Sequence, residues 1–366
     1  MFMMRKIIRY ALYVVALAIA WVGFWLTFGT INDWRPKGGE KTALTVVGSV
    51  NTKKIAPDSF NIFSWNIGYC GMGAETDFFF DRGATFTSGG GMVYPPKDLV
   101  EKYLNGFEAT LKNNPADFYF IQEVDTLAKR SYHINEFTET LKNLPDYNGT
   151  LGINYDCKYV PLPTFEPWHF YGDVKAGVAT FASVQPIEST RHQLPSEYGW
   201  PTRIFQLDRC LLVQRFKTKS GKDLVLINMH NSAHDHDGSL KKKEMVYLSN
   251  FCTTEFEKGN YVIAGGDWNE CPPYFKFDAL MPGKGEGYEQ INVDASIFND
   301  FQFIYDPVHT TNRKADLPYE HGKTFSTIID FFLISPNVKS DSIQVLSDSD
   351  FKYSDHQPIV GKFHLL

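Results

Sequence analysis

The sequence predicts an α/β protein, a four-layer sandwich in which two mixed β-sheets pack face to face between outer helices, preceded by one transmembrane helix. Three observations support this fold class. Several short runs in the central chain are apolar at successive positions, as in strands buried on both faces. Helical patterns separate only some of these runs, which favours mixed sheets. One long apolar segment lies near the N-terminus.

The N-terminal apolar segment, residues 7–28, contains 22 residues with a single charge, Arg9, near its start. This length crosses the hydrocarbon core of a bilayer as a helix. Basic residues precede the segment and tryptophans lie toward its far end, which is typical of membrane interfaces. We expect residues 1–29 to form an uncleaved, single-pass signal anchor, with the remainder on the extracytoplasmic side. A cleaved signal peptide is the alternative, because residues 18–20 have the small-x-small form.

Residues 30–58 are predicted to form a linker with one short strand, and residues 59–366 a single folded domain. Helical spacing of apolar residues predicts helices over 97–112, 133–144 and 239–256. Short apolar runs predict strands over 60–66, 117–125, 177–183, 210–216, 223–230, 261–267, 329–335 and 357–363.

Two irregular segments, residues 68–96 and 159–171, are rich in aromatic residues together with glycine or proline. Long loops of this kind in a compact domain are usually functional or disordered. One interpretation is a lid that shapes a substrate site and touches lipid. The other is a pair of ordered surface loops whose aromatic side chains pack on one another.

Composition restricts the class of partner. The chain has 36 basic and 42 acidic residues, a formal charge of −6, which argues against coating nucleic acid through a broad basic face. A small phosphorylated substrate bound through a metal remains compatible. Five scattered cysteines without C-x-x-C spacing indicate neither a zinc cage nor a disulfide framework. No feature indicates an obligate protein partner.

The stretch after residue 264 has the form of a buried strand that delivers polar residues into a site. An apolar run, residues 261–264, is followed by two glycines and then by Asp267 and Asn269. Glycines allow another backbone or a ligand to approach closely. A carboxylate and a carboxamide together suit the binding of a water and a phosphoryl oxygen near a divalent ion. A simple Asx turn that ends the strand is the alternative.

Polar residues recur at the ends of the other predicted strands. Taken singly, each has an ordinary explanation as a turn former, a surface carboxylate or a satisfied histidine. Their repetition at successive strand ends indicates a shared site. The residues are Asn66, Glu123, Asn228, His230, Asp267, Asn269, Asp330, Asp355 and His356.

Six blocks, in the order SWNIG, IQEVD, INMH, GGDWNE, IDFFLIS and SDHQPI, carry these residues. Their order and spacing resemble the signature blocks of the endonuclease/exonuclease/phosphatase superfamily. That superfamily includes DNase I-like nucleases, abasic-site endonucleases, neutral sphingomyelinases and inositol-polyphosphate 5-phosphatases. The resemblance covers nearly all of residues 60–366 and implies a DNase I-like fold.

The resemblance also implies a metal site. Glu123 would be the principal ligand of Mg²⁺, with Asn66 and Asp355 near it, and Mn²⁺ or Ca²⁺ are alternatives. Oxygen ligands are what such hard cations require.

The same resemblance implies roles in hydrolysis. Asp267 would orient or deprotonate the attacking water, and Asn269 would bind a non-bridging phosphate oxygen. His356, oriented by Asp330, and His230 would flank the phosphorus and stabilise the charge on its oxygens. The implied reaction is in-line attack of water on a phosphoester without a covalent enzyme intermediate.

We therefore expect a membrane-anchored phosphoester hydrolase, a phosphodiesterase or phosphatase that acts on a lipid headgroup or small phosphorylated molecule. An anchored extracytoplasmic nuclease is the first alternative, and a binding domain that keeps the fold without activity is the second. A His-rich stretch, residues 230–238, adds His234 and His236. It forms either a second metal or headgroup site, or a polar loop before a helix.

Overall fold

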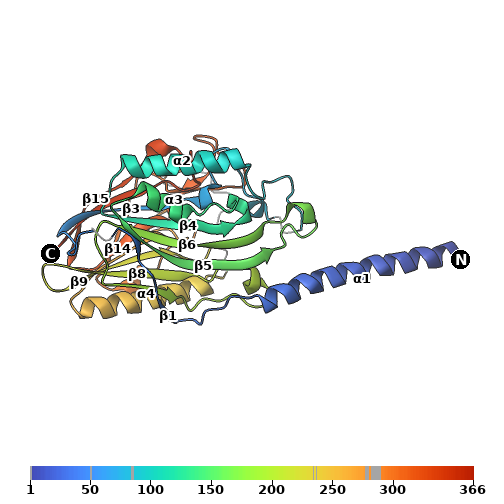
Figure 1. Cartoon of the computed structure of the whole chain (residues 1–366), viewed down its shortest axis with the longest axis horizontal. Helices are drawn as coiled ribbons and strands as arrows, with labels where there is room; N and C mark the ends of the chain where they lie inside the picture. The colour runs from blue at the N-terminus through green and yellow to red at the C-terminus, as the bar shows by residue number, and fades with distance from the viewer. Residues whose placement is uncertain are drawn as a thin grey trace.

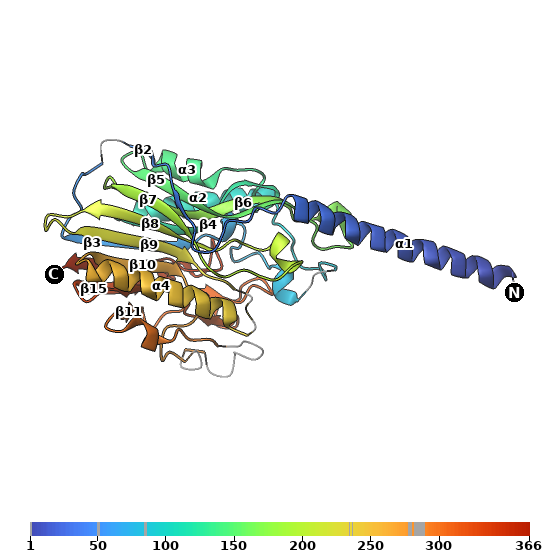
Figure 2. The same cartoon turned by 90° about the horizontal axis from the view of Figure 1, so that it is seen from below.

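A computed structural model gives the fold and describes residues 2–49, 52–83, 86–233, 235, 237–276, 280–281 and 290–366. Helix α1 (Phe2–Ile31) extends away from one end of the folded domain, and the C-terminus lies at the opposite end (Figures 1 and 2). The segment Met3–Ile31 is long and apolar enough to cross a membrane, and none of its most apolar window is buried.

The folded domain contains two seven-stranded mixed sheets. In spatial order, the first sheet consists of β1 (Lys41–Ala43), β7 (Glu188–Gln193), β8 (Cys210–Lys217), β9 (Asp223–His230), β10 (Tyr261–Asp267), β14 (Asp330–Ile334) and β11 (Gln302–Ile304). The second consists of β15 (Val338–Val345), β16 (Ile359–Leu365), β3 (Ser59–Asn66), β4 (Phe118–Ala128), β6 (Gly172–Ala182), β5 (Asn148–Val160) and β2 (Val47–Gly48).

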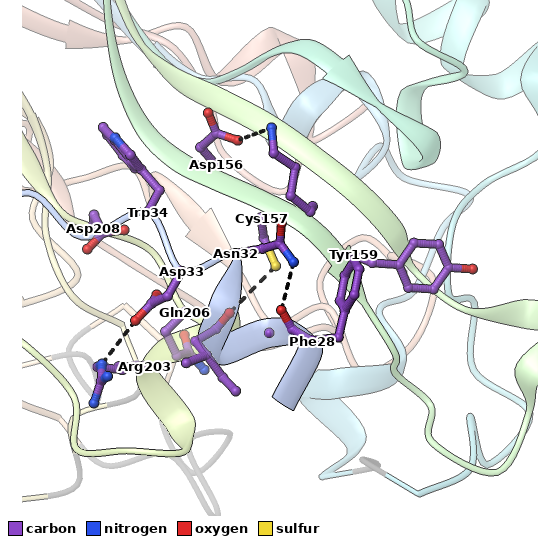
Figure 3. A pocket seen from close by; sticks show the side chains of 13 residues that line it. Phe28, Asn32, Asp33, Trp34, Asp156, Cys157, Tyr159, Arg203, Gln206 and Asp208 are labelled. Carbon is purple, nitrogen blue, oxygen red and sulfur yellow. Dashed lines mark hydrogen bonds and ion pairs between the residues drawn. The ribbon is translucent and has the colours of Figure 1, made fainter. Parts of the chain in front are cut away.

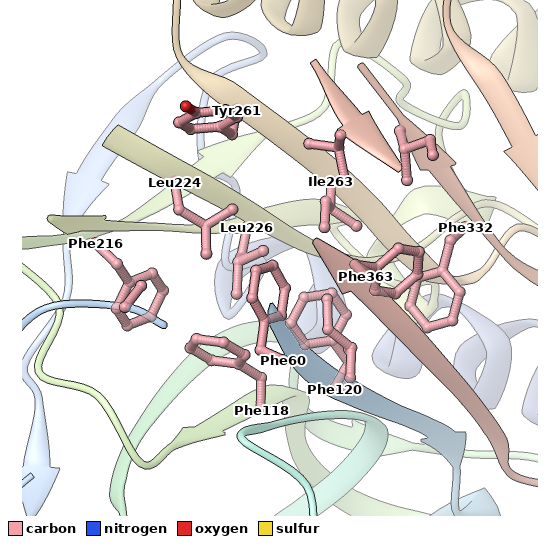
Figure 4. Close-up of a cluster of buried hydrophobic side chains, with 14 of the residues drawn as sticks. Phe60, Phe118, Phe120, Phe216, Leu224, Leu226, Tyr261, Ile263, Phe332 and Phe363 are labelled. Atoms are coloured by element: carbon pink, nitrogen blue, oxygen red, sulfur yellow. The ribbon is translucent and has the colours of Figure 1, made fainter. Parts of the chain in front are cut away.

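The main core lies between the two sheets. Aromatic rings from the second sheet, including Phe60 and Phe118, meet Phe216, Leu226 and other apolar side chains of the first (Figure 4). Phe60 and Phe118 form an edge contact with centroids 5.4 Å apart. Both strands that carry them are buried on two faces, which explains their nearly continuous apolar sequences.

Helices cover the outer faces, so the predicted four-layer α/β sandwich is confirmed. Helices α2 (Lys97–Asn113) and α3 (Glu136–Asn143) pack on the second sheet, and α4 (Ser239–Glu257) packs on the first. On α4, Met245, Leu248 and Cys252 recur at helical spacing and are buried against the sheet. Every predicted strand and helix overlaps an observed element.

Strands β5, β7, β11 and β15 were not predicted from the sequence, and two smaller features also differ from its pattern. Residues 41–48, inside the expected linker, contribute β1 to an edge of the first sheet and β2 to an edge of the second. These strands are too short and too exposed to leave an apolar signature. A small hairpin, β12 (Asn312–Arg313) and β13 (Ser326–Thr327), lies between β11 and β14 in the chain.

Candidate active site

The centre of the candidate site is set by strand register in the first sheet. Asp267 ends β10 and lies opposite His230, the last residue of the parallel strand β9. On its other side, Asp267 lies opposite Asp330, the first residue of the antiparallel strand β14. Pairing across three neighbouring strands therefore places two carboxylates and an imidazole at one edge of the sheet.

The second sheet brings an amide to the same place. Asn66 ends β3, and its Nδ2 donates to Asp267 Oδ2 at 2.9 Å and to Glu123 Oε1 at 3.1 Å. Its Oδ1 accepts a hydrogen bond from the Gly68 amide at 3.0 Å. Asn66 therefore links carboxylates that belong to different sheets, and this contact fixes how the two sheets meet at the site.

Glu123 is placed by a β-bulge rather than by the end of a strand. The register between β4 and β6 shifts between Ile121 and Val124, and Glu123 has a φ of 55° within this irregularity. A bulge redirects a side chain from the alternation of the strand, and a positive φ is costly for a residue with a Cβ. The strained backbone at Glu123 directs its carboxylate toward Asn66.

His356 is held by an acid on one ring nitrogen and an amide on the other. Its Nδ1 lies 2.8 Å from Asp330 Oδ2, and its Nε2 lies 2.9 Å from Asn312 Nδ2 and 3.6 Å from Asp267 Oδ2. Burial lowers the pKa of His356, but the nearby carboxylates of Asp330 and Asp267 outweigh it and raise the pKa to about 10. The two carboxylates therefore favour the imidazolium form of His356, whose Nε2–H donor requires the Asn312 amide to present its oxygen in place of its nitrogen.

His230 behaves in the opposite way. Burial, reinforced by the charge of Arg209, holds the pKa of His230 well below its usual value, so this imidazole is neutral. Its Nε2 lies 3.4 Å from Asp267 Oδ2, and its buried Nδ1 has no hydrogen-bond partner among the described residues. The two site histidines therefore differ in charge, one cationic and one neutral.

Asp355 and His356, neighbours in sequence, contact different groups. The Asp355 carboxylate lies 3.3 Å from the Ser354 hydroxyl, and a Cβ on Gly68 would come within 3.0 Å of its Oδ1. Gly68 also has a φ of 51°, which favours glycine. The Asp355 carboxylate therefore lies next to Gly68, after the end of β3, whereas the His356 ring contacts Asp330 at the start of β14.

Asn269 completes the edge beside Asp267. Its backbone amide donates to Asp267 Oδ1 at 2.9 Å, as in an Asx turn, and its φ is 51°. Its side chain donates to the Asn231 carbonyl at 2.9 Å. Lys241 also contributes, because its Nζ donates to the Asn269 carbonyl at 2.8 Å. The Asx turn considered as the alternative for this stretch is present, and phosphate binding by Asn269 stays a prediction.

The donor set fits a hard divalent cation. Burial first, and then the charge of Asp355, raise the pKa of Glu123. The two carboxylates therefore repel one another, and a cation bound between them would neutralise their charges. Asp267, Asp330 and His356 form a tighter cluster whose ligand atoms all lie within 4.8 Å. Asp330 and His356 already bind one another at 2.8 Å, so this cluster orients an imidazole.

Some residues differ from the sequence-based expectation. Asn228 points into the core between the sheets, where it donates to the Ala179 carbonyl at 2.8 Å and accepts from Gln122 at 2.8 Å. It is a structural residue outside the site. His234 and His236, considered as a second metal or headgroup site, lie outside the described residues.

Asn312 and Ser354 belong to the site but were not predicted from the sequence. Asn312 contacts His356 through its side chain and through an isolated backbone bridge. Ser354 Oγ donates to the Asn66 carbonyl at 2.7 Å and accepts from the His356 amide at 3.1 Å. Ser354 is the first residue of the SDHQPI block, which is a usable signal, whereas Asn312 lies in a polar stretch without a flanking apolar run.

Comparisons with known proteins agree with this architecture. The profile of the Endonuclease/Exonuclease/phosphatase family matches residues 63–356. No curated protein sequence gives a significant match.

Among solved structures, an endonuclease/exonuclease/phosphatase from Beutenbergia cavernae is similar with a TM-score of 0.55 at 15% identity, covering 84% of this chain and 72% of that one. The 2',3'-cyclic phosphatase ANGEL2, in complex with adenosine-2',3'-vanadate, gives 0.53 at 15% identity, covering 88% and 99%. The human Nocturnin catalytic domain with bound sulfate gives 0.50 at 16% identity, covering 88% and 97%. At these identities the similarity concerns the fold.

Proposed function

The chain belongs to the endonuclease/exonuclease/phosphatase family, and from this membership we propose that it is a membrane-anchored, metal-dependent phosphodiesterase or phosphatase of lipid headgroups or small phosphorylated molecules. Phosphoester hydrolysis follows from the family; the anchor, the ion and the substrate are the proposal. The observation that carries it is the single Asn66 amide that binds Glu123 and Asp267 at the edge of two sheets. That contact joins the expected metal ligand to the expected water-activating carboxylate.

The expected metal is Mg²⁺, with Mn²⁺ and Ca²⁺ as alternatives. Glu123 and Asp355 would hold it, with Asn66 beside them, and when bound it would neutralise charge on the phosphoryl and leaving oxygens. Asn66 at present offers its amide nitrogen to both Glu123 and Asp267 while its oxygen accepts from Gly68. We therefore propose that Asn66 serves first as the spacer between the carboxylates.

Different side chains would accept the proton of the attacking water and stabilise the charge on the phosphoryl oxygens. Asp267, a buried carboxylate fixed by Asn66 and by the Asn269 amide, would orient the attacking water and accept its proton. The His356 imidazolium would stabilise negative charge that develops on the phosphoryl oxygens, while neutral His230 would donate a hydrogen bond. Asp330 keeps the proton on His356 Nδ1, which leaves Nε2 directed at the substrate.

The substrate class is inferred from the position of the site relative to α1. Strand β16 runs antiparallel to β3 with His364 opposite Ser59, so the Ser59 end of β3 lies near the C-terminus. The Asn66 end therefore faces the end of the domain from which α1 emerges (Figures 1 and 2). If α1 spans a bilayer, the site opens toward the membrane, where phosphorylated headgroups are concentrated.

Parallel assays of the full chain would test this proposal. We expect Mg²⁺-dependent hydrolysis of lipid phosphoesters in vesicles, abolished by Asp267→Asn. Asp223→Asn is a matched control, because Asp223 begins β9 at the opposite edge of the same sheet. Efficient cutting of DNA or RNA without lipid turnover would instead support the anchored nuclease. Complete release of the protein from membranes by alkaline carbonate would refute the anchor.

A further inference from the structure

Exposed phenylalanine and tryptophan side chains of the domain are concentrated at one place. Among the described residues after α1, every Phe or Trp that is more than half exposed belongs to a set of four. Trp168 is 77% exposed, and the others are Phe86, Phe165 and Trp200. Large apolar side chains left in water at one site are typical of an interaction surface. We call these four residues the aromatic collar.

The aromatic collar surrounds the C-terminal end of α1. On one side, Trp25 stacks on Tyr159 with centroids 5.1 Å apart, and Trp21 lies 6.2 Å from Phe170, two residues after Trp168. On the other side, the Trp200 indole donates to the Thr30 hydroxyl at 3.1 Å. Figure 3 shows this junction, where Phe28 and Tyr159 lie close together.

The loops that carry the collar are held in place by their own contacts. The Phe165 amide donates to the Phe86 carbonyl at 2.8 Å, and the two rings stack with centroids 5.5 Å apart. The Glu166 carboxylate accepts from the Ser88 amide at 2.9 Å. The backbone is therefore fixed while the rings point outward, an arrangement that preorganises the surface for binding.

Three acidic groups around the junction are paired with cations, and burial raises the pKa of a fourth, Asp208, to about 7. Asp33 binds Arg203 at 3.1 Å, and Asp156 binds Lys175 at 3.1 Å. Glu197 forms an ion pair with Arg35. Pairing reduces the desolvation and repulsion that free carboxylates would bring to a phospholipid surface.

The length of α1 sets the level of the collar relative to a bilayer. The apolar run of 22 residues is about 33 Å long as a helix, close to the roughly 30 Å hydrocarbon core. Trp21 precedes the end of that run by about 10 Å along the helix axis. Domain segments that contact Trp25 and Trp21 therefore lie about 5 to 10 Å inside the end of the apolar run, the depth at which interfacial apolar side chains are buried.

We propose that the aromatic collar inserts into the headgroup region of that leaflet and fixes the orientation of the domain on the membrane. The proposal rests on the proposed membrane anchoring by α1. Tryptophan and phenylalanine are suited to this level because indole rings favour the interface and phenyl rings favour its apolar side. The occupant of the surface is thus phospholipid, of the same bilayer that α1 crosses.

The aromatic collar also sets the distance between the candidate active site and the lipid surface. The β5–β6 hairpin continues from Gly177, which pairs with Val124 beside Glu123, to Gly172, which pairs with Val160. This overhang measures about 17 Å along the strands. A single helix leaves the domain free to rotate about its axis. Contacts of the aromatic collar with lipid on both sides of α1 would prevent this rotation. The strand ends that carry the site would then keep facing the lipid surface.

Bromolipid quenching of tryptophan fluorescence in the full chain tests the proposal. The protein is reconstituted into phosphatidylcholine vesicles whose acyl chains carry bromine either near the headgroup or near the terminal methyl group. We expect Trp168→Phe to remove part of the quenching by the shallow bromines and none of the quenching by the deep ones. Leu366→Trp is the control, because it adds an exposed indole at the end opposite α1 (Figure 1). That added indole should remain unquenched.

The helix and the collar give separate signals. The double variant Trp21→Phe, Trp25→Phe reports whether α1 lies in lipid. Loss of quenching in this variant, with quenching unchanged in Trp168→Phe and Trp200→Phe, would overturn the collar and keep the anchor. Unchanged quenching in all of these variants would overturn both.

Activity supplies an independent readout. We expect Phe165→Ser, Trp168→Ser to lower the ratio of vesicle-substrate to soluble-phosphodiester hydrolysis at least several-fold, with soluble turnover unchanged. Leu366→Ser is the matched exposed-apolar control and should leave the ratio as in the wild type. An unchanged ratio in the double variant would contradict an orienting role for the collar.

Discussion

Replacing Asp330 by asparagine isolates the electrostatic part of the site. Asp330 Oδ2 lies 2.8 Å from His356 Nδ1, and the Asp330 residue is only 2% exposed. Asparagine has nearly the same shape but no charge. The substitution therefore keeps the packing between β14 and the His356 loop while it removes the nearest charge that stabilises the imidazolium.

The structure gives the size of the expected effect. The pKa of His356 is raised from 6.5 to about 10, even though burial alone lowers it. A shift of this size corresponds to a net preference for the charged ring of about 5 kcal/mol. The Asp330 charge is the largest contribution that opposes burial. Without it we expect the pKa of His356 to fall, although the remaining charges of Asp267 and Asp355 still favour the imidazolium.

Two measurements on Asp330→Asn check this expectation. A nitrogen-15 NMR titration of metal-free protein should show His356 charged at pH 7 in the wild type and a clearly lower His356 pKa in the variant. Loss of one charge-stabilising donor should lower kcat for a soluble phosphodiester about 10²- to 10³-fold. A variant in which His356 still titrates near pH 10, or one with wild-type kcat, would refute the assigned role of Asp330.

Three further substitutions test other parts of the molecule. Glu123→Gln should lower metal-dependent hydrolysis on the order of 10²-fold or more and weaken Mg²⁺ binding measured by calorimetry, whereas Glu101→Gln on the exposed face of α2 should do neither. Gly68→Ala should reduce both activity and Tm, because its φ is 51° and the new methyl would lie 2.7 Å from Met72 Cβ. Glu255→Gln should destabilise the fold by about 1 to 2 kcal/mol at neutral pH after allowance for solvent screening. Burial raises the pKa of Glu255, but hydrogen bonds from Arg215, Lys258 and Asn260 lower it to about 2. This stabilisation is complete above pH 4.5 and is lost as the pH falls through about 2, so the difference from the wild type in urea unfolding should be large at pH 7 and vanish near pH 2.

The sequence was informative where burial makes strands nearly continuous in apolar residues. Strand β9 occupies residues 223–230, as predicted, because it lies between two neighbouring strands and is covered on both faces. The end of such a strand is visible as the first polar residue. Asp267 and His230 were therefore found together, and parallel pairing places them opposite one another.

Features that depend on tertiary contacts were not visible. The bulge that aims Glu123 arises from a register shift against β6, to which no local pattern corresponds. Asn312 reaches His356 from a two-residue strand in a polar stretch. Asn228 was wrongly grouped with the site residues, because this polar residue near a strand end forms hydrogen bonds between the two sheets instead.

Locating a bound metal tests the central claim most directly. Crystals of the protein with Mn²⁺ should give an anomalous scattering peak within ligand distance of the Glu123 and Asp355 carboxylates, with Asp267 and His356 facing a phosphate on the other side. A peak confined to the cluster of Asp267, Asp330 and His356, or the absence of any peak in this region despite metal-dependent activity, would contradict the account.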